Sequence, residues 1–296
     1  PKKKLFWESI KGVSIQAIHD QPCLVFAFSP DLGLPDKKHF LTGFNPSRPN
    51  ISLAGLDAQA QDQLAEAIGR HLRNRSDLSA VDITNPVREV REFMESLREI
   101  APMPWATSFL VVANAIVWIA MVAAGANILG SPISMLYEWG ANSTSAVQNG
   151  QAWRLLSSMF LHGNVFHLVI NMAALVSAGL IVERIYGHRL YALIYFASGI
   201  VGSSLSLYFA SQTTVAVGAS GAIFGVTGAL FVAIFQHRKR LPKSFSKQMI
   251  TSLSFFITYS IIQSLTKTGI DTAAHIGGLV AGSALAFILP ERLNIE

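Results

Sequence analysis

The chain has 296 residues, of which 51% are hydrophobic and 14% are charged, whereas soluble domains carry roughly 25% charged residues. This composition excludes a protein that is soluble throughout and indicates a membrane protein. The formal net charge of +5 does not indicate a nucleic-acid partner, because the basic residues lie mostly in the N-terminal region and beside apolar segments.

The first hundred residues predict a small soluble α+β domain. Apolar residues alternate over 13–17 and form a short run over 24–28, as in two strands, and they recur at helical spacing over 64–72. A third strand is expected near 81–83. The single cysteine, Cys23, excludes an intramolecular disulfide, and its apolar neighbours predict a buried structural thiol. No motif that carries chemistry occurs in this region.

A charged amphipathic segment links this region to the apolar remainder. It covers residues 85–100, ends at Pro102 and Pro104, and is followed by Trp105. Such a segment is typical of a linker helix at the membrane surface, with the tryptophan as its interfacial anchor. We therefore expect a cytoplasmic soluble domain with a linker helix over 1–100 and a membrane domain over 101–296.

Six stretches of the second region approach the roughly 20 apolar residues that a membrane-spanning helix needs. They cover 105–126, 165–185, 190–210, 220–236, 248–266 and 272–289. The expected fold is an α-helical polytopic membrane protein, a bundle of six transmembrane helices preceded by the small α+β domain.

Basic residues in the short loops lie mostly on one side of the predicted bundle. This side carries Arg184, Arg189, Arg238, Lys239, Arg240, Lys243, Lys247 and Arg292, and the other carries only Arg154 and Lys267. Because loops rich in Lys and Arg stay in the cytoplasm, the N-terminus is expected there. In a bacterium the protein would lie in the inner membrane, with Ser220 near the periplasmic face.

Four polar residues of the predicted spans converge on one plane. Ser220 follows Gly218 and precedes Gly221 where the fourth span begins. Counted at about 1.5 Å per residue from the cytoplasmic ends, Ser220, His167 and His275 all lie roughly 24 to 25 Å above the inner edge. Asn171 lies one turn deeper, on the same helix face as His167. Small residues and serine are also typical of helix packing, but the shared depth favours a site.

This set of side chains suits nucleophilic catalysis. A serine hydroxyl needs a neighbouring base, which an imidazole supplies, and an oxyanion needs donors such as the Ser220 N–H, the Asn171 amide and the other imidazole. No aspartate or glutamate lies at that depth, so a Ser/His dyad without an acidic member is expected. A metal site formed by His162, His167 and His275 is less consistent, because no carboxylate or cysteine accompanies them and Ser220 would have no role.

At these residues the sequence resembles the rhomboid family of intramembrane serine proteases, of the bacterial type with a six-span core and an N-terminal soluble domain. The resemblance covers about residues 101–290. Its motifs occur in the family's order: Trp153-Arg154, His162, His167, Asn171, Gly218 to Gly221, and Ala274 to Gly278 followed by Gly282. It implies that Ser220 is the nucleophile, that His275 is the general base, and that His167 and Asn171 are the side-chain part of the oxyanion hole.

Other residues are expected to support this site. Gly278 and Gly282 give the sixth span a face of small residues that lets the fourth span approach closely. Phe224, one turn below Ser220, either packs against the His275 imidazole or is an ordinary core residue. Trp153 and Arg154 follow an apolar loop expected in the outer interface, and His162 is expected to brace that loop.

The expected function is an intramembrane endopeptidase that cleaves transmembrane segments of other membrane proteins near their outer end. The expected partners are transmembrane protein substrates and membrane lipids, with no nucleic acid, cofactor or metal. A transporter could line a polar pathway with the same residues, but the spans show no inverted repeat. A non-catalytic membrane adaptor that binds transmembrane helices is the other alternative.

Overall fold

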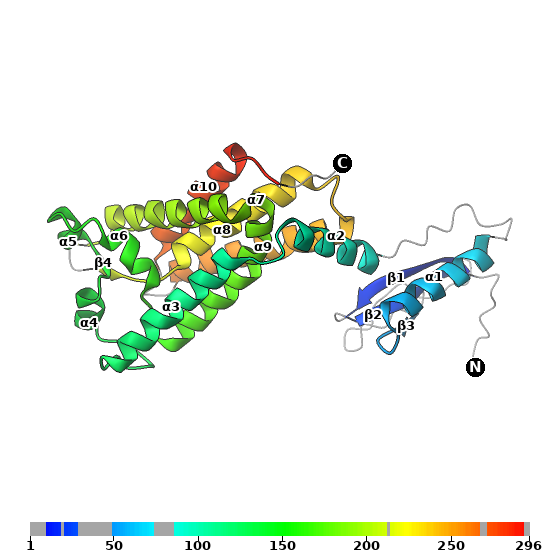
Figure 1. The fold of residues 1–296 in the computed structure, drawn as a ribbon, viewed down its shortest axis with the longest axis horizontal. Coiled ribbons are helices and arrows are strands. Elements are labelled where there is room, and N and C mark those ends of the chain that lie inside the picture. The colour runs from blue at the N-terminus through cyan, green and yellow to red at the C-terminus, as the bar shows by residue number, and fades with distance from the viewer. Residues whose placement is uncertain are drawn as a thin grey trace. The chain divides into compact units, whose positions relative to one another are not determined.

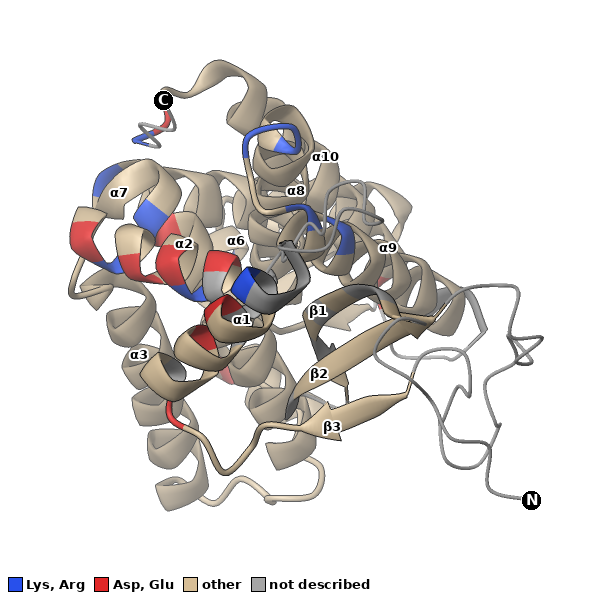
Figure 2. Cartoon of the chain, turned by 90° about the vertical axis from the view of Figure 1, so that its right-hand side faces the viewer, with Lys and Arg blue, Asp and Glu red and all other residues tan. Residues whose placement is uncertain are grey.

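The computed structural model describes residues 10–18, 21–28, 49–73, 86–211, 214–266 and 271–292 (Figure 1). The chain divides into two compact units, Pro1–Met94 and Glu95–Glu296. Charged residues gather on helices α1 and α2 and near some helix ends, while long stretches of the other helices contain none (Figure 2). The expected functional division near residue 100 remains a prediction.

A three-stranded antiparallel sheet forms the N-terminal unit together with a helix. The strands are β1 (Ile10–Ile18), β2 (Gln21–Phe28) and β3 (Asn50–Ser52), in the order β1-β2-β3, followed by α1 (Ala58–Arg73). The core comprises Ile10, Val13, Ile15, Leu24 and Leu53, with Phe26, Phe28, Leu64 and Ile68 packed against it. This confirms the α+β character of the region.

The details of this unit differ from the sequence prediction in one strand. β3 was not expected from the sequence, and it pairs with β2 from Val25↔Asn50 to Cys23↔Ser52. The strand expected near 81–83 lies outside the described residues. Cys23 is a free, buried thiol in β2. A further helix, α2 (Pro86–Ile100), crosses the boundary between the two units.

Five long helices form the membrane unit: α3 (Trp105–Ala123), α7 (Val165–Phe209), α8 (Ser220–His237), α9 (Lys243–Thr266) and α10 (Thr272–Ile288). Short elements fill the loop between α3 and α7: α4 (Ile133–Glu138), β4 (Asn142–Ser143), α5 (Thr144–Gln148), α6 (Arg154–Ser157) and a 3₁₀ turn, η3 (Ser158–Phe160). β4 pairs with β5 (Val215–Ala216), just before α8. The loop is thereby fixed to the segment that leads to Ser220.

Helix α7 contains the second and third predicted spans. These were expected as separate helices over 165–185 and 190–210, and α7 does consist of two helical segments, which meet at a kink where Gly187 has φ 76° and ψ 164°. Glycine adopts a positive φ without a steric penalty, so the chain changes direction there without a loop. The sequence predicts the two segments but does not show that a single residue connects them.

Three of the described helices, α3, α7 and α8, are long and apolar enough to cross a membrane. α10 is equally apolar in character but shorter, with 17 residues. Large apolar side chains such as Phe109, Ile119 and Ile170 are more than half exposed on these helices, as lipid-facing residues are. The protein is an integral membrane protein of helical bundle type, as the sequence predicts.

Close contacts between glycines join α8 to α10. A Cβ on Gly278 would overlap the carbonyl oxygen of Gly221, and one on Gly282 would overlap the carbonyl of Gly225. The backbones approach this closely only because these side chains are absent, which is the packing that small residues permit between membrane helices. The first turns of the two helices therefore lie side by side.

A buried carboxylate joins α7 to the start of α3. Glu183 is fully buried and accepts hydrogen bonds from the N–H groups of Ala106 and Thr107, at 2.8 and 2.7 Å, and from the Thr107 hydroxyl at 2.6 Å. His188 lies 2.5 Å from the same carboxylate. Since α3 has no capping side chain of its own, Glu183 supplies the cap from a neighbouring helix.

Candidate active site

Ser220 is the first residue of α8 and is presented by a glycine turn. Gly218 has φ 126°, a conformation that side chains other than glycine rarely adopt, and its N–H donates to the Ser158 carbonyl at 2.9 Å. Residue 219 is an alanine and gives the helix no capping side chain. Within the described residues the first turn of α8 has no capping side chain from its N-cap, so its N–H groups are placed to hold an anion.

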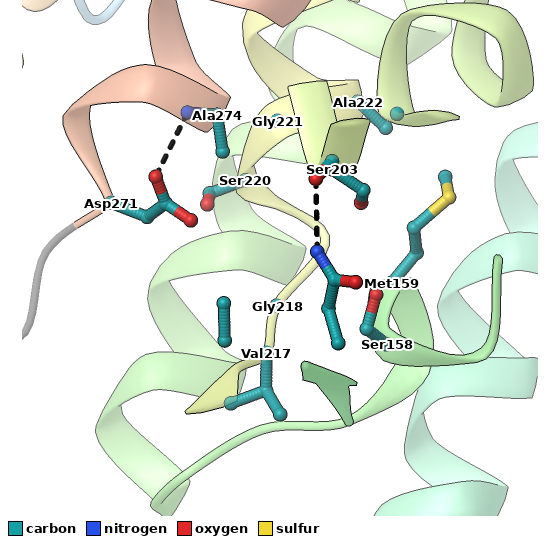
Figure 3. A pocket seen from close by; sticks show the side chains of 13 residues that line it. Ser158, Met159, Ser203, Val217, Gly218, Ser220, Gly221, Ala222, Asp271 and Ala274 are labelled. Carbon is teal, nitrogen blue, oxygen red and sulfur yellow. Dashed lines mark hydrogen bonds between the residues drawn. The ribbon is translucent and has the colours of Figure 1, made fainter. Parts of the chain in front are cut away.

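Ser220 lines a small pocket at this turn (Figure 3). The pocket has a volume of about 20 Å³, which is room for about one water molecule. Its lining comprises Asn142, Ser158, Met159, Gly199, Ser203, Ala216, Val217, Gly218, Ser220, Gly221, Ala222, Asp271 and Ala274. Ser220 therefore borders a space that a water molecule could occupy.

His275 lies on the first turn of α10 and is only 7% exposed. Its ring stacks on Phe224, with centroids 4.3 Å apart and an interplanar angle of 9°. The residue before it, Ala274, lines the Ser220 pocket, and its carbonyl oxygen would lie 3.3 Å from a Cβ on Gly221. Within the described chain no hydrogen bond joins His275 to Ser220; such bonds are often long in unliganded enzymes.

His167 lies beside the glycine turn, whereas Asn171 is one turn away. A Cβ on Gly218 would lie 2.9 Å from His167 Nε2 and 3.8 Å from Ser220 Oγ, so the imidazole and the hydroxyl both border this glycine. Asn164 caps α7 by accepting from the His167 N–H at 2.8 Å. The buried Asn171 donates from Nδ2 to the His167 carbonyl at 2.9 Å.

His162 supports this arrangement from outside the spans. It is 0% exposed, and its ring meets the His167 ring edge-on at 5.1 Å. Burial lowers the pKa of His162 to about 3, and the neighbouring His167 adds to the shift. His162 is therefore neutral at physiological pH and packs as a buried brace against His167.

Comparison with known proteins identifies the relatives of this chain. A sequence model of the Rhomboid domain matches residues 149–292. Putative rhomboid protease YdcA of Bacillus subtilis (strain 168) is 30% identical over 189 residues, which are 62% of this chain and 88% of YdcA. The chain belongs to the rhomboid family.

Two further relatives match with higher identity over shorter stretches. Rhomboid protease GluP of Bacillus subtilis (strain 168) is 39% identical over 53% of this chain and 30% of GluP. Rhomboid-like protease 1 of Toxoplasma gondii is 34% identical over 54% of this chain and 55% of the relative. This rhomboid protein thus spans about half or less of the length of these two relatives. Its Rhomboid domain match includes every candidate site residue from Trp153 to Gly282.

Trp153 and Arg154 fasten the first loop of this rhomboid protein and do not line the pocket. Arg154 is 5% exposed and donates to the carbonyl oxygens of Tyr137 and Ala141, at 2.6 and 3.0 Å. Its guanidinium also lies 4.3 Å from the Tyr137 ring centroid. The Trp153 ring fills the space beside Gly140, whose φ is 103°. The two residues therefore hold the first loop in place.

The sequence reading missed one charged residue of the pocket. Asp271 precedes α10, lines the pocket with Ser220, and accepts from the Ala274 N–H at 2.9 Å (Figure 3). The expectation was that no aspartate or glutamate lies at the depth of Ser220; Asp271 is one turn further out than His275 and still lines the pocket. The available signal was an aspartate directly before a helix, the usual residue of an N-cap. Among the described residues no three His, Cys, Asp or Glu side chains gather as a metal site would require.

Proposed function

We propose that this rhomboid protein is an intramembrane serine endopeptidase that cleaves transmembrane segments of other membrane proteins near their outer end. One observation carries the proposal. The first turns of α8 and α10 lie side by side, with Ser220 on a water-sized pocket and His275 stacked on Phe224. Family membership supports the same reaction, since the matched relatives include proteins named rhomboid proteases.

In the proposed reaction, Ser220 Oγ attacks the carbonyl carbon of the substrate peptide bond while His275 accepts the hydroxyl proton. The proton then passes to the leaving amine, and an acyl-enzyme remains on Ser220. A water molecule attacks this ester, its proton moves to His275, and the new carboxyl group leaves as Ser220 recovers its proton. Only the second half, hydrolysis of the acyl-enzyme, returns the protein to its starting state, and the full cycle consumes one water molecule.

Negative charge develops on the carbonyl oxygen in both halves of this reaction. The Ser220 N–H at the start of α8 and the imidazole of His167 are the proposed donors, because both border Gly218. The Asn171 amide, which already donates one hydrogen to the His167 carbonyl, has a second hydrogen for the same purpose. Phe224 holds the His275 ring in place by stacking.

The proposed location is the inner membrane of a bacterium, with the N-terminus in the cytoplasm and the active site open to the periplasmic side. The basic residues of the loops support this orientation, since Arg238, Lys239 and Arg240 directly follow the end of α8 opposite Ser220. Substrates would be single transmembrane helices that reach the site from the lipid. This orientation predicts that a protease added outside spheroplasts cannot cleave the N-terminal unit.

Labelling with a fluorophosphonate tests the proposal. The purified protein in detergent should form one covalent adduct, which mass spectrometry of the peptides should locate on Ser220. Ser220→Ala should remove the adduct, and His275→Ala should slow its formation strongly while each variant still melts cooperatively. A wild-type protein that is folded but unreactive would favour the adaptor or transporter reading.

A further inference from the structure

Asp271 holds two helices with the two oxygens of one carboxylate. Its Oδ1 accepts from the Ala274 N–H of α10 at 2.9 Å, and the Ser206 hydroxyl of α7 donates to its Oδ2. The backbone carbonyl of Asp271 also accepts the His275 N–H at 3.2 Å. Figure 3 shows the carboxylate beside the Ser220 pocket. The residue thus links the first turn of α10 to α7 at the rim of the site.

The turn that Asp271 caps is in close contact with both neighbouring helices, α7 and α8. The Ala274 carbonyl oxygen would lie 2.7 Å from a Cβ on Gly202 of α7 and 3.3 Å from one on Gly221 of α8. Because His275 lies on this turn, a small rotation of the turn would move His275 relative to Ser220. A helix end that loses its capping side chain is destabilised, so such rotations become more frequent without the cap.

We propose that Asp271 is a positioning residue, which fixes the first turn of α10 so that the His275 imidazole stays within reach of Ser220. This inference rests on the proposed Ser220/His275 dyad. Asp271 acts through hydrogen bonds to the backbone and to Ser206, and it exchanges no proton with the substrate. An isosteric amide should therefore replace it, because the Asn oxygen can still accept from Ala274 and its NH₂ group can donate to Ser206.

The N-terminal unit provides a matched control with the same local geometry. Asp57 precedes α1, its Oδ1 accepts from the Ala60 N–H at 2.7 Å, and its carbonyl accepts from the Gln61 N–H at 3.0 Å. Residue 61 therefore occupies the place in α1 that His275 occupies in α10. Asp57→Ala removes an equivalent cap from a helix that carries none of the proposed chemistry.

The experiment measures the second-order rate constant for fluorophosphonate labelling of Ser220, together with kcat and KM for a single-span substrate, in the full-length protein. Asp271→Ala should lower the labelling constant and kcat by about 10- to 100-fold, the cost of misplacing a catalytic group by about 1 Å, with KM unchanged. Ser206→Ala, which removes one of the two ties, should lower them by a smaller factor. Asp271→Asn and Asp57→Ala should react like the wild type.

Hydrogen–deuterium exchange of the peptide covering the start of α10 gives a second readout that needs no activity. Asp271→Ala should exchange about five- to tenfold faster there, and Asp271→Asn should not. Labelling at the wild-type rate in a faster-exchanging Asp271→Ala would overturn the proposal, as would equal losses in Asp271→Asn and Asp271→Ala. A wild-type protein that does not label contradicts the dyad instead, and exchange then decides alone whether Asp271 fixes the turn.

Discussion

The N-terminal unit buries isoleucine, valine and leucine side chains, whereas the membrane unit buries Arg154, Asn171, Glu183 and two histidines among its helices. In the N-terminal unit, burial of apolar surface away from water drives folding. In lipid that gain is absent between helices, so close backbone packing and internal hydrogen bonds hold the bundle. A buried polar residue is therefore exceptional in the N-terminal unit, whereas in the membrane unit it indicates a structural hydrogen bond or a reactive group.

Within the membrane unit the buried polar residues fall into two groups. Glu183 and Arg154 use their hydrogen bonds on backbone groups of other segments, which makes them structural ties. The second group comprises Ser220, which is half-buried and lines the pocket, and His275, whose Nδ1 atom has no hydrogen-bond partner in the described structure. We expect the side chains near the pocket that are not engaged in structural hydrogen bonds to be the ones that react.

The largest expected effect is loss of turnover on removing either member of the dyad. Ser220→Ala and His275→Ala should each lower kcat by up to about 10⁶-fold, as for serine and histidine elsewhere that act as a unit. The double variant should be no worse than either single one. Additive losses in turnover assays of the three purified variants would mean that the two residues act separately.

The proposed oxyanion donors should have a smaller effect. His167→Ala and Asn171→Ala should each lower kcat by about 10²- to 10³-fold, the range for losing one donor, with KM nearly unchanged. Steady-state kinetics with a single-span substrate check this. If Asn171→Ala unfolded the protein but left the turnover of the remaining folded fraction intact, Asn171 would belong with the structural ties.

Adding a methyl group at the contact between α8 and α10 should lower the stability of the membrane unit. Gly282→Ala places a methyl group against the Gly225 backbone, and overpacking of this kind costs about 1–3 kcal/mol or more. Thermal melting in detergent measures the loss. The matched control is Gly130→Ala, where no atom lies within 4 Å of an added Cβ. Equal melting temperatures for the two variants would show that the helices can separate freely.

In the N-terminal unit, a substitution that removes side-chain volume from the core should lower stability. Ile15 is fully buried in the apolar core of the sheet, so Ile15→Ala should destabilise that unit by about 2–5 kcal/mol. Turnover should stay at the wild-type level, because the residues proposed for chemistry all lie in the other unit. Proteolysis of the N-terminal unit beside a turnover assay separates the two effects.

His162 should make the stability of the membrane unit depend on pH. Its pKa is about 3 in the folded protein and about 6.5 in the unfolded chain, so only the unfolded chain binds a proton between these values. Stability is therefore lost as the pH falls below 6.5, by up to about 1.4 kcal/mol per pH unit from this residue. Melting of the wild type and of His162→Gln at pH 7 and 5 should show a smaller acid loss in the variant.

Much of the fold was predictable from the sequence, for physical reasons that also explain the misses. Apolar length and glycine spacing predicted α8, α10 and their close contact, because both are properties of single helices. The break between the two segments of α7 was predicted because Arg184 and Arg189 interrupt the apolar run, but the sequence did not show that Gly187 alone connects them. Strand β3 depends on pairing with a distant strand, which a three-residue segment does not reveal.

The residues of the site also divide into those that the sequence could predict and those that it could not. Ser220, His167 and His275 could be placed at one depth by counting helical rise, which needs no knowledge of neighbours. The role of Asp271 depends on Ser206, 65 residues earlier in the chain, and the roles of Trp153 and Arg154 depend on the path of the first loop. Contacts between elements far apart in sequence need the three-dimensional structure.

Two truncations should have the smallest effect on turnover. A chain that starts at 101 and one that starts at 95 should both retain activity, because the proposed site lies beyond residue 152. The longer one should melt higher, since it keeps Leu97, which is 0% exposed and whose burial contributes about 1.5–3 kcal/mol. Loss of turnover in a folded truncation would give the N-terminal unit a part in the site.

The contrast between structural ties and reactive side chains is tested most directly by cleavage in liposomes. The wild type and Ser220→Ala would each be reconstituted with one single-span substrate, and the products would be identified by mass spectrometry. The account predicts a single cut in the outer part of the transmembrane segment by the wild type and intact substrate with the variant. The same cut at the same rate by folded Ser220→Ala would contradict it.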